Sequence, residues 1–276
     1  MTYKTLLVRL DLNGDNDGLL KIAGDLAEQF GAKVIGIAAA QPILPVYGEG
    51  YITADVATEH RAEVDKEIAA CHAQFRQALT SRVKHIEWRS TVTHASLADY
   101  IAQEARCADL IITGTDIGAS LMDNSRRVNI GDLVIKAGRP VLIVPQGISS
   151  LSLRHVFVAW KDTRQARRAV ADALPLLEAA GHAGVLEVTS ESDQENAKAR
   201  VRDVERWLEG HGISAAPQAI GTQSGEIGYL HAELLNQKCD LLIAGAYGHN
   251  RLGEWMFGGV TKDVLLDPDF CVLLSH

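Results

Sequence analysis

Short apolar runs alternate with segments of helical periodicity along the whole chain. Apolar residues recur at three- and four-residue intervals between Leu19 and Phe30, and again between Ala166 and Leu177, which is typical of helices that bury one face. Longer segments with the same periodicity run from Val64 to Leu79 and from Ala197 to Leu208. The short runs are rich in Val, Ile and Leu, and they predict strands at 4–10, 33–39, 85–90, 109–113 and 140–144, then at 154–160, 183–189, 214–219, 240–244 and 270–274.

Several predicted strands are apolar at consecutive positions, so both of their faces must be buried. Residues 110–113 read Leu-Ile-Ile-Thr and residues 141–144 read Val-Leu-Ile-Val. Strands of this kind belong to parallel sheets that helices cover on both sides. The alternation of strands and helices therefore predicts an α/β fold with doubly wound open parallel five-stranded sheets. Ligands in that architecture bind at the carboxyl ends of the strands.

The sequence repeats itself once. Residues 109–144 align with residues 240–275 without a gap, and residues 4–8 align with residues 154–158. A chain of 276 residues is long enough for two ordinary domains. The repeat therefore predicts two tandem copies of one domain.

The two copies are predicted to span 1–146 and 153–276, joined by the Gly- and Ser-containing linker Pro145–Ser152. The final strand of each copy, Val141–Val144 and Val272–Leu274, is apolar, and an apolar strand at a sheet edge needs a partner. A linker of about eight residues reaches roughly 25 Å when extended. The linker is therefore long enough for the two final strands to meet within one chain.

Composition excludes several classes of partner. The formal net charge is −8 and no long basic run occurs, so we expect neither a nucleic acid nor a membrane surface as partner. The sequence shows no apolar stretch of membrane-spanning length and no signal-peptide pattern, which predicts a cytoplasmic protein. The histidines and cysteines lack metal-ligand spacing, and no Gly-x-Ser-x-Gly motif occurs. We therefore predict no metal site and no catalytic residue.

Candidate chemistry is concentrated in the last third of the sequence. The apolar run that ends at Ala244 is followed by Gly245-x-x-Gly248 and, after nine more residues, by Gly258-Gly259. Glycine lets the backbone approach an anion closely, so two glycine turns ahead of a helix can direct several N–H groups at a phosphate. The segment lacks the Lys-Ser/Thr of a Walker loop and follows a late strand, unlike the dinucleotide fingerprint.

This segment resembles the Gly-x2-Gly-x9-Gly-Ser/Thr signature of the ATP-binding branch of the universal stress protein family, with Gly259 in place of the Ser/Thr. Thr261 and the residues after it resemble the helix that follows the loop in that family. The resemblance covers both copies and implies five-stranded parallel α/β sheets that associate through their last strands, which meet across a two-fold axis between separate chains in that family. We therefore expect the two final strands here to lie side by side and antiparallel within one chain, as an intrachain pseudo-dimer whose copies are related by an approximate two-fold axis. It also implies ATP or a related adenine nucleotide as ligand, with or without Mg²⁺, held by the glycine loop and by an aspartate just after the first strand.

The resemblance divides the implied site between the copies. The first copy has Asp11 at the position of the family aspartate, but its loop keeps only Gly114 and adds the acidic Asp116. The second copy keeps the loop, but Lys161 stands where the aspartate belongs, and lysine cannot accept hydrogen bonds. Lys161 is either an added cation for the phosphates or a sign that the base and sugar are held differently. Asp162 could replace the aspartate only if the turn is shifted. We expect nucleotide in the second copy alone.

The predicted nucleotide-binding residues of the second copy are Gly245, Gly248, Gly258, Gly259, Val260, Thr261, Lys161, His249 and Arg251, and the weaker candidates of the first copy are Asp11 and Gly114. Three functions stay open: a nucleotide-binding stress or regulatory protein, a scaffold for partner proteins that binds no nucleotide, and a slow ATPase. Hydrolysis needs a group that orients water, and the loop offers no identified carboxylate for that task. Association of two whole chains into a homodimer also stays open.

Overall fold

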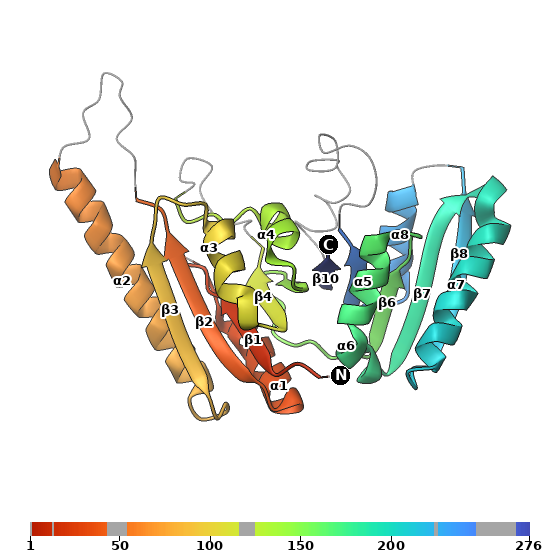
Figure 1. The fold of residues 1–276 in the computed structure, drawn as a ribbon, viewed down its shortest axis with the longest axis horizontal. Coiled ribbons are helices and arrows are strands. Elements are labelled where there is room, and N and C mark those ends of the chain that lie inside the picture. Colours follow the sequence, from red (N-terminus) through yellow and green to blue (C-terminus); the bar gives the residue numbers. More distant parts are fainter. Residues whose placement is uncertain (1, 13, 43–53, 116–124, 224–225, 247–268) are drawn as a thin grey trace, which may run out of the picture. The chain divides into compact units, whose positions relative to one another are not determined.

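The described elements fall into two compact units of the computed structural model (Figure 1). The first unit is Tyr3–Ala137, and the second is Gly138–His276 together with Met1–Thr2. The structure describes residues 2–12, 14–42, 54–115, 125–223, 226–246 and 269–276.

The first unit is a parallel sheet with strands in the order β3-β2-β1-β4. Its strands are β1 (Thr5–Arg9), β2 (Lys33–Ala40), β3 (Ile86–Val92) and β4 (Leu110–Gly114), and its helices are α1 (Asp17–Phe30), α2 (Ala54–Leu79), α3 (Leu97–Glu104), the short η1 (Ala105–Cys107) and α4 (Ile130–Ala137). All five residues of β1 are buried, as expected for a strand that is covered on both faces. Helix α1 ends at Gly31, whose φ of 61° lies in the left-handed region that glycine adopts without strain.

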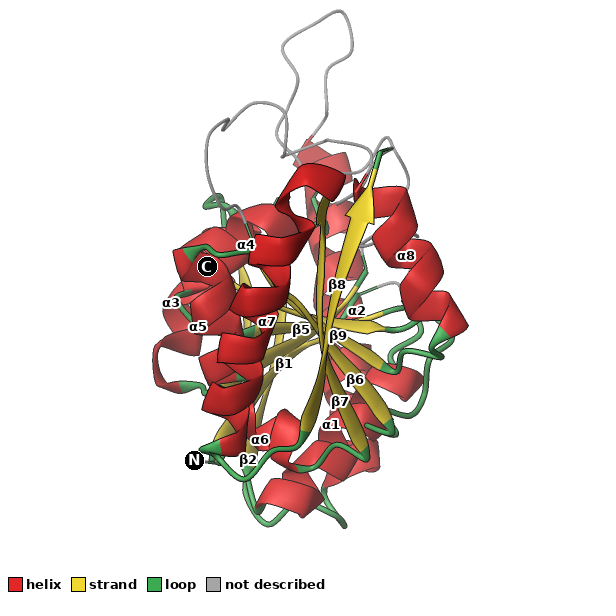
Figure 2. Cartoon of the chain, turned by 90° about the vertical axis from the view of Figure 1, so that its right-hand side faces the viewer, coloured by secondary structure: helices red, strands yellow, loops and turns green. Residues whose placement is uncertain are grey.

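The second unit has strands in the order β5-β10-β9-β6-β7-β8. Its strands are β5 (Val141–Val144), β6 (His155–Ala159), β7 (His182–Ser190), β8 (Ala215–Thr222), β9 (Leu241–Gly245) and β10 (Cys271–Ser275), and its helices are α5 (Arg164–Asp172), α6 (Leu174–Glu178), the short η2 (Glu191–Asp193), α7 (Gln194–Glu209) and α8 (Glu226–Asn236). Helices α5 and α7 lie on one side of the strands and α8 on the other (Figure 2). This is the doubly wound arrangement that the sequence predicts.

The two final strands pair antiparallel, which confirms the expected arrangement. Val272 of β10 lies opposite Ile143 of β5, and Leu273 lies opposite Leu142. On its other side β10 is parallel to β9. Because of this pairing, the last strand of the first sequence repeat is part of the second compact unit. The paired strands are fully buried, so neither is left as an exposed apolar edge.

One predicted helix is wrong in its extent. The periodicity from Ala166 to Leu177 predicts a single helix, whereas the structure has α5 and then the short α6, with the break at Ala173. Pro175 lies in the first turn of α6 and has no N–H with which to continue the hydrogen bonds of α5. The helix predicted after the glycine loop lies outside the described residues.

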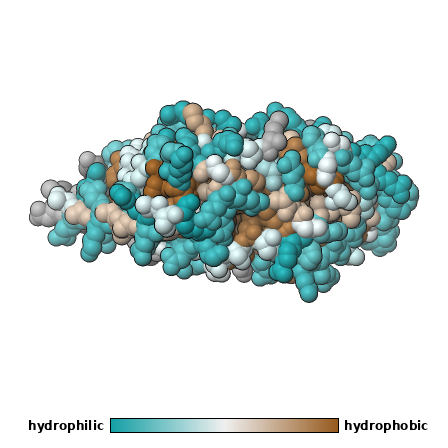
Figure 3. Space-filling view, turned by 90° about the horizontal axis from the view of Figure 1, so that it is seen from below, coloured by the Kyte–Doolittle hydropathy of each residue, from teal (hydrophilic) through white to brown (hydrophobic). Residues whose placement is uncertain are grey.

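Polar side chains dominate the surface that is seen from below, where apolar residues form small separate patches (Figure 3). In the described part of the chain, no helix combines the length and apolar character needed to span a membrane.

Candidate functional site

The carboxyl edge of the second sheet contains a topological switch point. Strand β6 ends at Ala159 beside Ala244 of β9, and β9 ends at Gly245 beside Ser275 of β10. The chain continues from β6 to β7 on one side, and from β9 to β10 on the other. Open α/β sheets bind ligands where the connections diverge in this way. Lys161 and the start of the predicted glycine loop therefore leave the sheet at the same edge.

Only part of the predicted site can be placed in the structure. Gly245 and Lys161 are described, and both lie at the switch point. The other predicted residues of the second copy lie outside the described residues: Gly248, His249, Arg251, Gly258, Gly259, Val260 and Thr261. Their role stays a prediction.

Gly245 has a packing function that is independent of any ligand. A Cβ added at this position would lie 2.5 Å from the carbonyl carbon of Gln165 and would also collide with the backbone nitrogen of Ala166. These atoms belong to the first turn of α5. Glycine therefore allows the end of β9 to pack directly on the start of α5. The sequence prediction assigned Gly245 to phosphate binding and missed this contact.

The turn between β6 and α5 is short and ends in a helix cap. The Thr163 N–H donates to the Lys161 carbonyl over 2.6 Å. The buried Thr163 Oγ1 accepts a hydrogen bond of 3.2 Å from the Ala166 N–H, which is the N-cap contact expected of threonine. Asp162, in the turn, forms an ion pair of 3.2 Å with Arg167 of α5. The turn thus brings the N-terminal end of α5 to the switch point next to Lys161.

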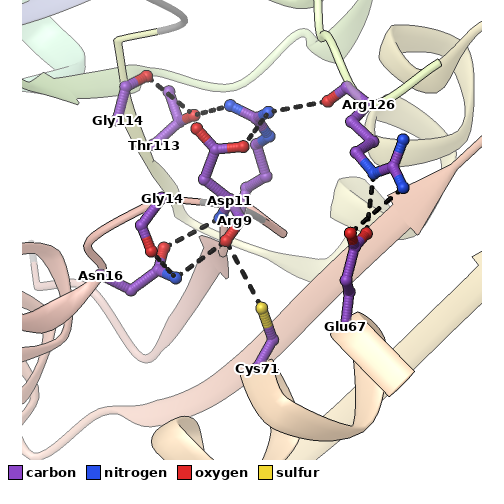
Figure 4. Close-up of polar contacts among 9 residues, drawn as sticks. All are labelled: Arg9, Asp11, Gly14, Asn16, Glu67, Cys71, Thr113, Gly114 and Arg126. Carbon is purple, nitrogen blue, oxygen red and sulfur yellow. Dashed lines mark hydrogen bonds and ion pairs between the residues drawn. The ribbon is translucent and has the colours of Figure 1, made fainter. Parts of the chain in front are cut away.

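The corresponding edge of the first unit holds a buried arginine. Arg9 is the last residue of β1 and is 4% exposed, and one of its nitrogens lies 3.6 Å from Asp11 Oδ1. The same guanidinium donates hydrogen bonds of 3.4 Å to Thr113 Oγ1 and to the Arg126 carbonyl (Figure 4). Thr113 in turn donates to the carbonyl of Gly114. The structure therefore brings the two first-copy candidates, Asp11 and Gly114, to one edge, where the Arg9 guanidinium contacts both Asp11 and Thr113.

A second arginine at this edge is also neutralised. Arg126 donates to both carboxylate oxygens of Glu67 over 2.7 and 3.1 Å, and the two side chains are 10% and 14% exposed. Bidentate pairs of this type are the strong ones among protein hydrogen bonds. Sequence reasoning missed Arg9, Arg126 and Glu67. The available signal was a basic residue at the end of the otherwise apolar run Thr5–Arg9.

The turn that carries Asp11 is fixed by side chains. Asn16 Oδ1 accepts from the Asp11 N–H over 2.8 Å, and Asn16 Nδ2 donates to the Asp11 carbonyl over 2.9 Å. The Cys71 thiol donates to the same carbonyl over 3.4 Å. Burial raises the pKa of Cys71 to about 11, so at neutral pH this group is a neutral thiol.

Metal chemistry finds no support in the described ranges, where no three His, Cys, Asp or Glu side chains form a group able to hold an ion. The cysteines are free thiols, and Cys239 and Cys271 are buried. Burial raises the pKa of each of these two thiols to about 12. These thiols act as small apolar side chains.

Solved structures provide the informative comparison, since no protein-family model and no curated protein matches the sequence. A universal stress protein from Archaeoglobus fulgidus DSM 4304 superposes with a TM-score of 0.77 at 15% identity, over 98% of this chain and 95% of that one. A putative universal stress protein from Pseudomonas aeruginosa UCBPP-PA14 gives 0.64 at 16% identity, over 99% of this chain and 93% of that one. A functionally unknown protein from Pseudomonas aeruginosa PAO1 gives 0.63 at 15% identity, over 99% and 92%. The chain therefore has the universal stress protein fold across both of its units.

Proposed function

We propose that this chain, which has a tandem universal stress protein fold, binds an adenine nucleotide such as ATP at the carboxyl edge of its second unit, in a regulatory role. The observation that carries the proposal is the meeting of three features at one switch point: Lys161, the N-terminal end of α5 and the start of the predicted glycine loop after Gly245. A lysine and a helix N-terminus both favour a phosphate group.

The contrast between the units supports a single site. At the edge of the first unit, Arg9 contacts Asp11, and Arg126 is held by Glu67. A triphosphate there would have to compete with these carboxylates for buried guanidinium groups, which is costly because breaking a buried pair leaves a charge uncompensated. The second unit has no arginine at the end of β6, where Ala159 stands. We therefore place one nucleotide on each chain.

The proposal is tested by isothermal titration calorimetry of the full chain with ATP and, separately, with adenosine. We expect about one ATP per chain and affinity at least ~10-fold higher for ATP than for adenosine, which corresponds to about 1.4 kcal/mol. Two equivalent sites per chain would refute the asymmetry. Absence of binding would refute nucleotide function and favour a scaffold for partner proteins.

Two variants distinguish the contribution of the glycine loop to ATP affinity from that of Lys161. Gly258→Val adds a branched side chain where the backbone should face phosphate, so ATP affinity should fall at least ~10-fold. Gly228→Ala in α8 is the matched control, because a Cβ there would meet no atom within 4 Å. Lys161→Ala should weaken ATP and leave adenosine unchanged if the lysine contacts phosphate. Equal losses for both ligands would assign Lys161 to the nucleoside instead. Release of phosphate from bound ATP, measured alongside, tests for slow ATPase activity.

A further inference from the structure

A cavity of about 410 Å³ lies between α5 and α7 in the second unit. Its lining residues are Trp160, Asp162, Arg167, Val170, Arg200, Asp203, Val204 and Trp207. This volume falls within the range of about 300–1,000 Å³ that is usual for small-molecule pockets. Helix α5 packs against β9 and β10, and α7 packs against β7 and β8, so β6 lies between the two helices in the strand order (Figure 1).

The cavity begins beside the switch point, at Trp160 and Asp162, and extends away from it. Helix α7 starts after the carboxyl end of β7 and returns the chain to the amino end of β8, so its later turns lie away from the carboxyl edge. Trp207 lies in the last turn of α7, which ends at Glu209, and it lines the cavity. The opening therefore extends down the face of the sheet, whereas Lys161 and Gly245 stand at its upper edge.

Small side chains on α7 explain why this space is hollow. In the first unit α2 buries the large Phe75, whose ring fills the space above Gly36 and contacts Trp88 with 5.5 Å between the ring centroids. The buried residues of α7 are Ala197, Val201, Val204 and Leu208, none of which is aromatic. The aromatic residue of α7, Trp207, is 43% exposed instead. The buried face of α7 therefore has no aromatic ring that would fill the space towards α5.

The charged groups around the cavity are already paired. Arg167 contacts Asp162 over 3.2 Å, and the Arg200 guanidinium lies 2.6 Å from Asp193 and also binds the buried Glu187. A ligand with a net charge would gain no unpaired counter-ion from either arginine. The remaining lining consists of two indoles, the valines at 170 and 204, and Asp203, which is itself paired with Arg206 over 2.5 Å. The indoles and valines favour a flat, uncharged ring.

One polar atom of the lining is unsatisfied. The indole Nε1 of Trp160 is buried and has no hydrogen-bond partner among the described residues. A buried donor without an acceptor is destabilising, so such groups call for an explanation. An acceptor atom on a ligand in the cavity would supply the missing partner.

We propose that the cavity between α5 and α7 binds an uncharged planar heteroaromatic molecule of two or three fused rings, which stacks on indole surface and accepts a hydrogen bond from Trp160. This site is independent of the nucleotide proposed at the switch point.

The test compares quinoline with naphthalene, which has the same shape and lacks the ring nitrogen. The indole N–H signals of the four tryptophans are followed by two-dimensional ¹H–¹⁵N NMR of the full chain. We expect quinoline to shift the signals of Trp160 and Trp207 saturably while Trp88 in the first unit stays unchanged. Quinoline should bind about 5-fold more tightly than naphthalene, as expected for one added hydrogen bond. Absence of a saturable shift, or equal affinity for the two probes, would overturn the proposal.

Variants and competition make the assignment specific. Trp160→Phe replaces the indole by a phenyl ring, which keeps an aromatic face and removes the N–H donor. The affinity for quinoline, measured from the Trp207 signal, should then fall to that of naphthalene, while the affinity for naphthalene should be unchanged. Val204→Phe should fill the cavity and abolish binding of both probes, with retained folding checked by circular dichroism. Saturating ATP should leave quinoline binding unchanged. Displacement of quinoline by ATP, or unchanged quinoline affinity in Trp160→Phe, would contradict the separate site.

Discussion

Gly245→Ala should destabilise the second unit even when no ligand is present. The new Cβ would lie 2.5 Å from the Gln165 carbonyl carbon and would collide with the Ala166 nitrogen as well. Overpacking typically costs about 1–3 kcal/mol. Both neighbours are backbone atoms of α5, which cannot rotate away as a long side chain can. We therefore expect the upper end of that range, about 3 kcal/mol.

The assay is thermal unfolding followed by calorimetry, with hydrogen exchange used to locate the weakened elements. A loss of about 3 kcal/mol corresponds to a fall in Tm of roughly 6–12 °C for a unit of this size. Exchange should accelerate in β9 and α5 and stay unchanged in β1 and β2 of the first unit. The control is Gly228→Ala, which is exposed on α8 with no atom within 4 Å of the added Cβ. It should raise stability by about 0.5–1 kcal/mol through helix propensity. A Gly245→Ala protein with the same Tm as the parent would refute close packing of β9 on α5.

Three further predictions concern the thiols and the paired final strands. In the native protein a thiol reagent should react with Cys107 alone, because the other three cysteines are buried. Labelling of any buried cysteine as fast as that of Cys107, in protein that is still folded, would contradict this. Burial raises the pKa of Cys239 from 9.0 to about 12, so the stability that its neutral thiol contributes is intact below pH 9 and is lost as the pH rises towards 12. Urea unfolding above pH 9 should therefore show a smaller loss in Cys239→Ala than in the parent, and equal losses would contradict the linkage. A Leu142→Cys, Leu273→Cys protein should form an intrachain disulfide, since these residues lie directly opposite; disulfides that form only between chains would indicate exchanged strands.

The strands could be predicted from sequence because a strand that is buried on both faces is apolar at consecutive positions. Strands β4 and β5 consist almost wholly of apolar residues, and both lie within two residues of their predicted positions. The pairing of β5 with β10 was expected because an apolar edge needs a partner, and its antiparallel direction because the last strands associate across a two-fold axis in the family that the sequence resembles. The break between α5 and α6 was missed because the periodicity of apolar residues continues through Pro175. Periodicity reports which face is buried, whereas the hydrogen-bond pattern depends on the proline.

The positions of candidate residues in the fold were predictable where they follow directly from the order of residues along the chain. Lys161 and Asp11 each come just after a strand, so the fold alone brings them to a carboxyl edge. The partners of Arg126 were not predictable in the same way. Glu67 is 59 residues away from it, and Arg9 is 117 residues away. The cavity beside Trp160 was missed for a related reason, because it depends on the sizes of side chains that face each other from separate helices.

The two units differ in charge at equivalent positions, and this difference bears on which of them binds phosphate. Arg9 is the last residue of β1, and Ala159 is the last residue of β6. The residue that follows has the same backbone hydrogen bond in both units: the Leu10 N–H donates to the Ile37 carbonyl, and the Trp160 N–H donates to the Leu186 carbonyl. Two residues after the strand stand Asp11 in the first unit and Lys161 in the second. The arginine and aspartate of the first unit sum to zero charge, while the alanine and lysine of the second sum to a net positive charge. An incoming phosphate would meet a neutralised arginine in one unit and a lysine beside a helix N-terminus in the other. The second unit therefore lacks the carboxylate that Asp11 brings to the first, which is the electrostatic basis for proposing the nucleotide there.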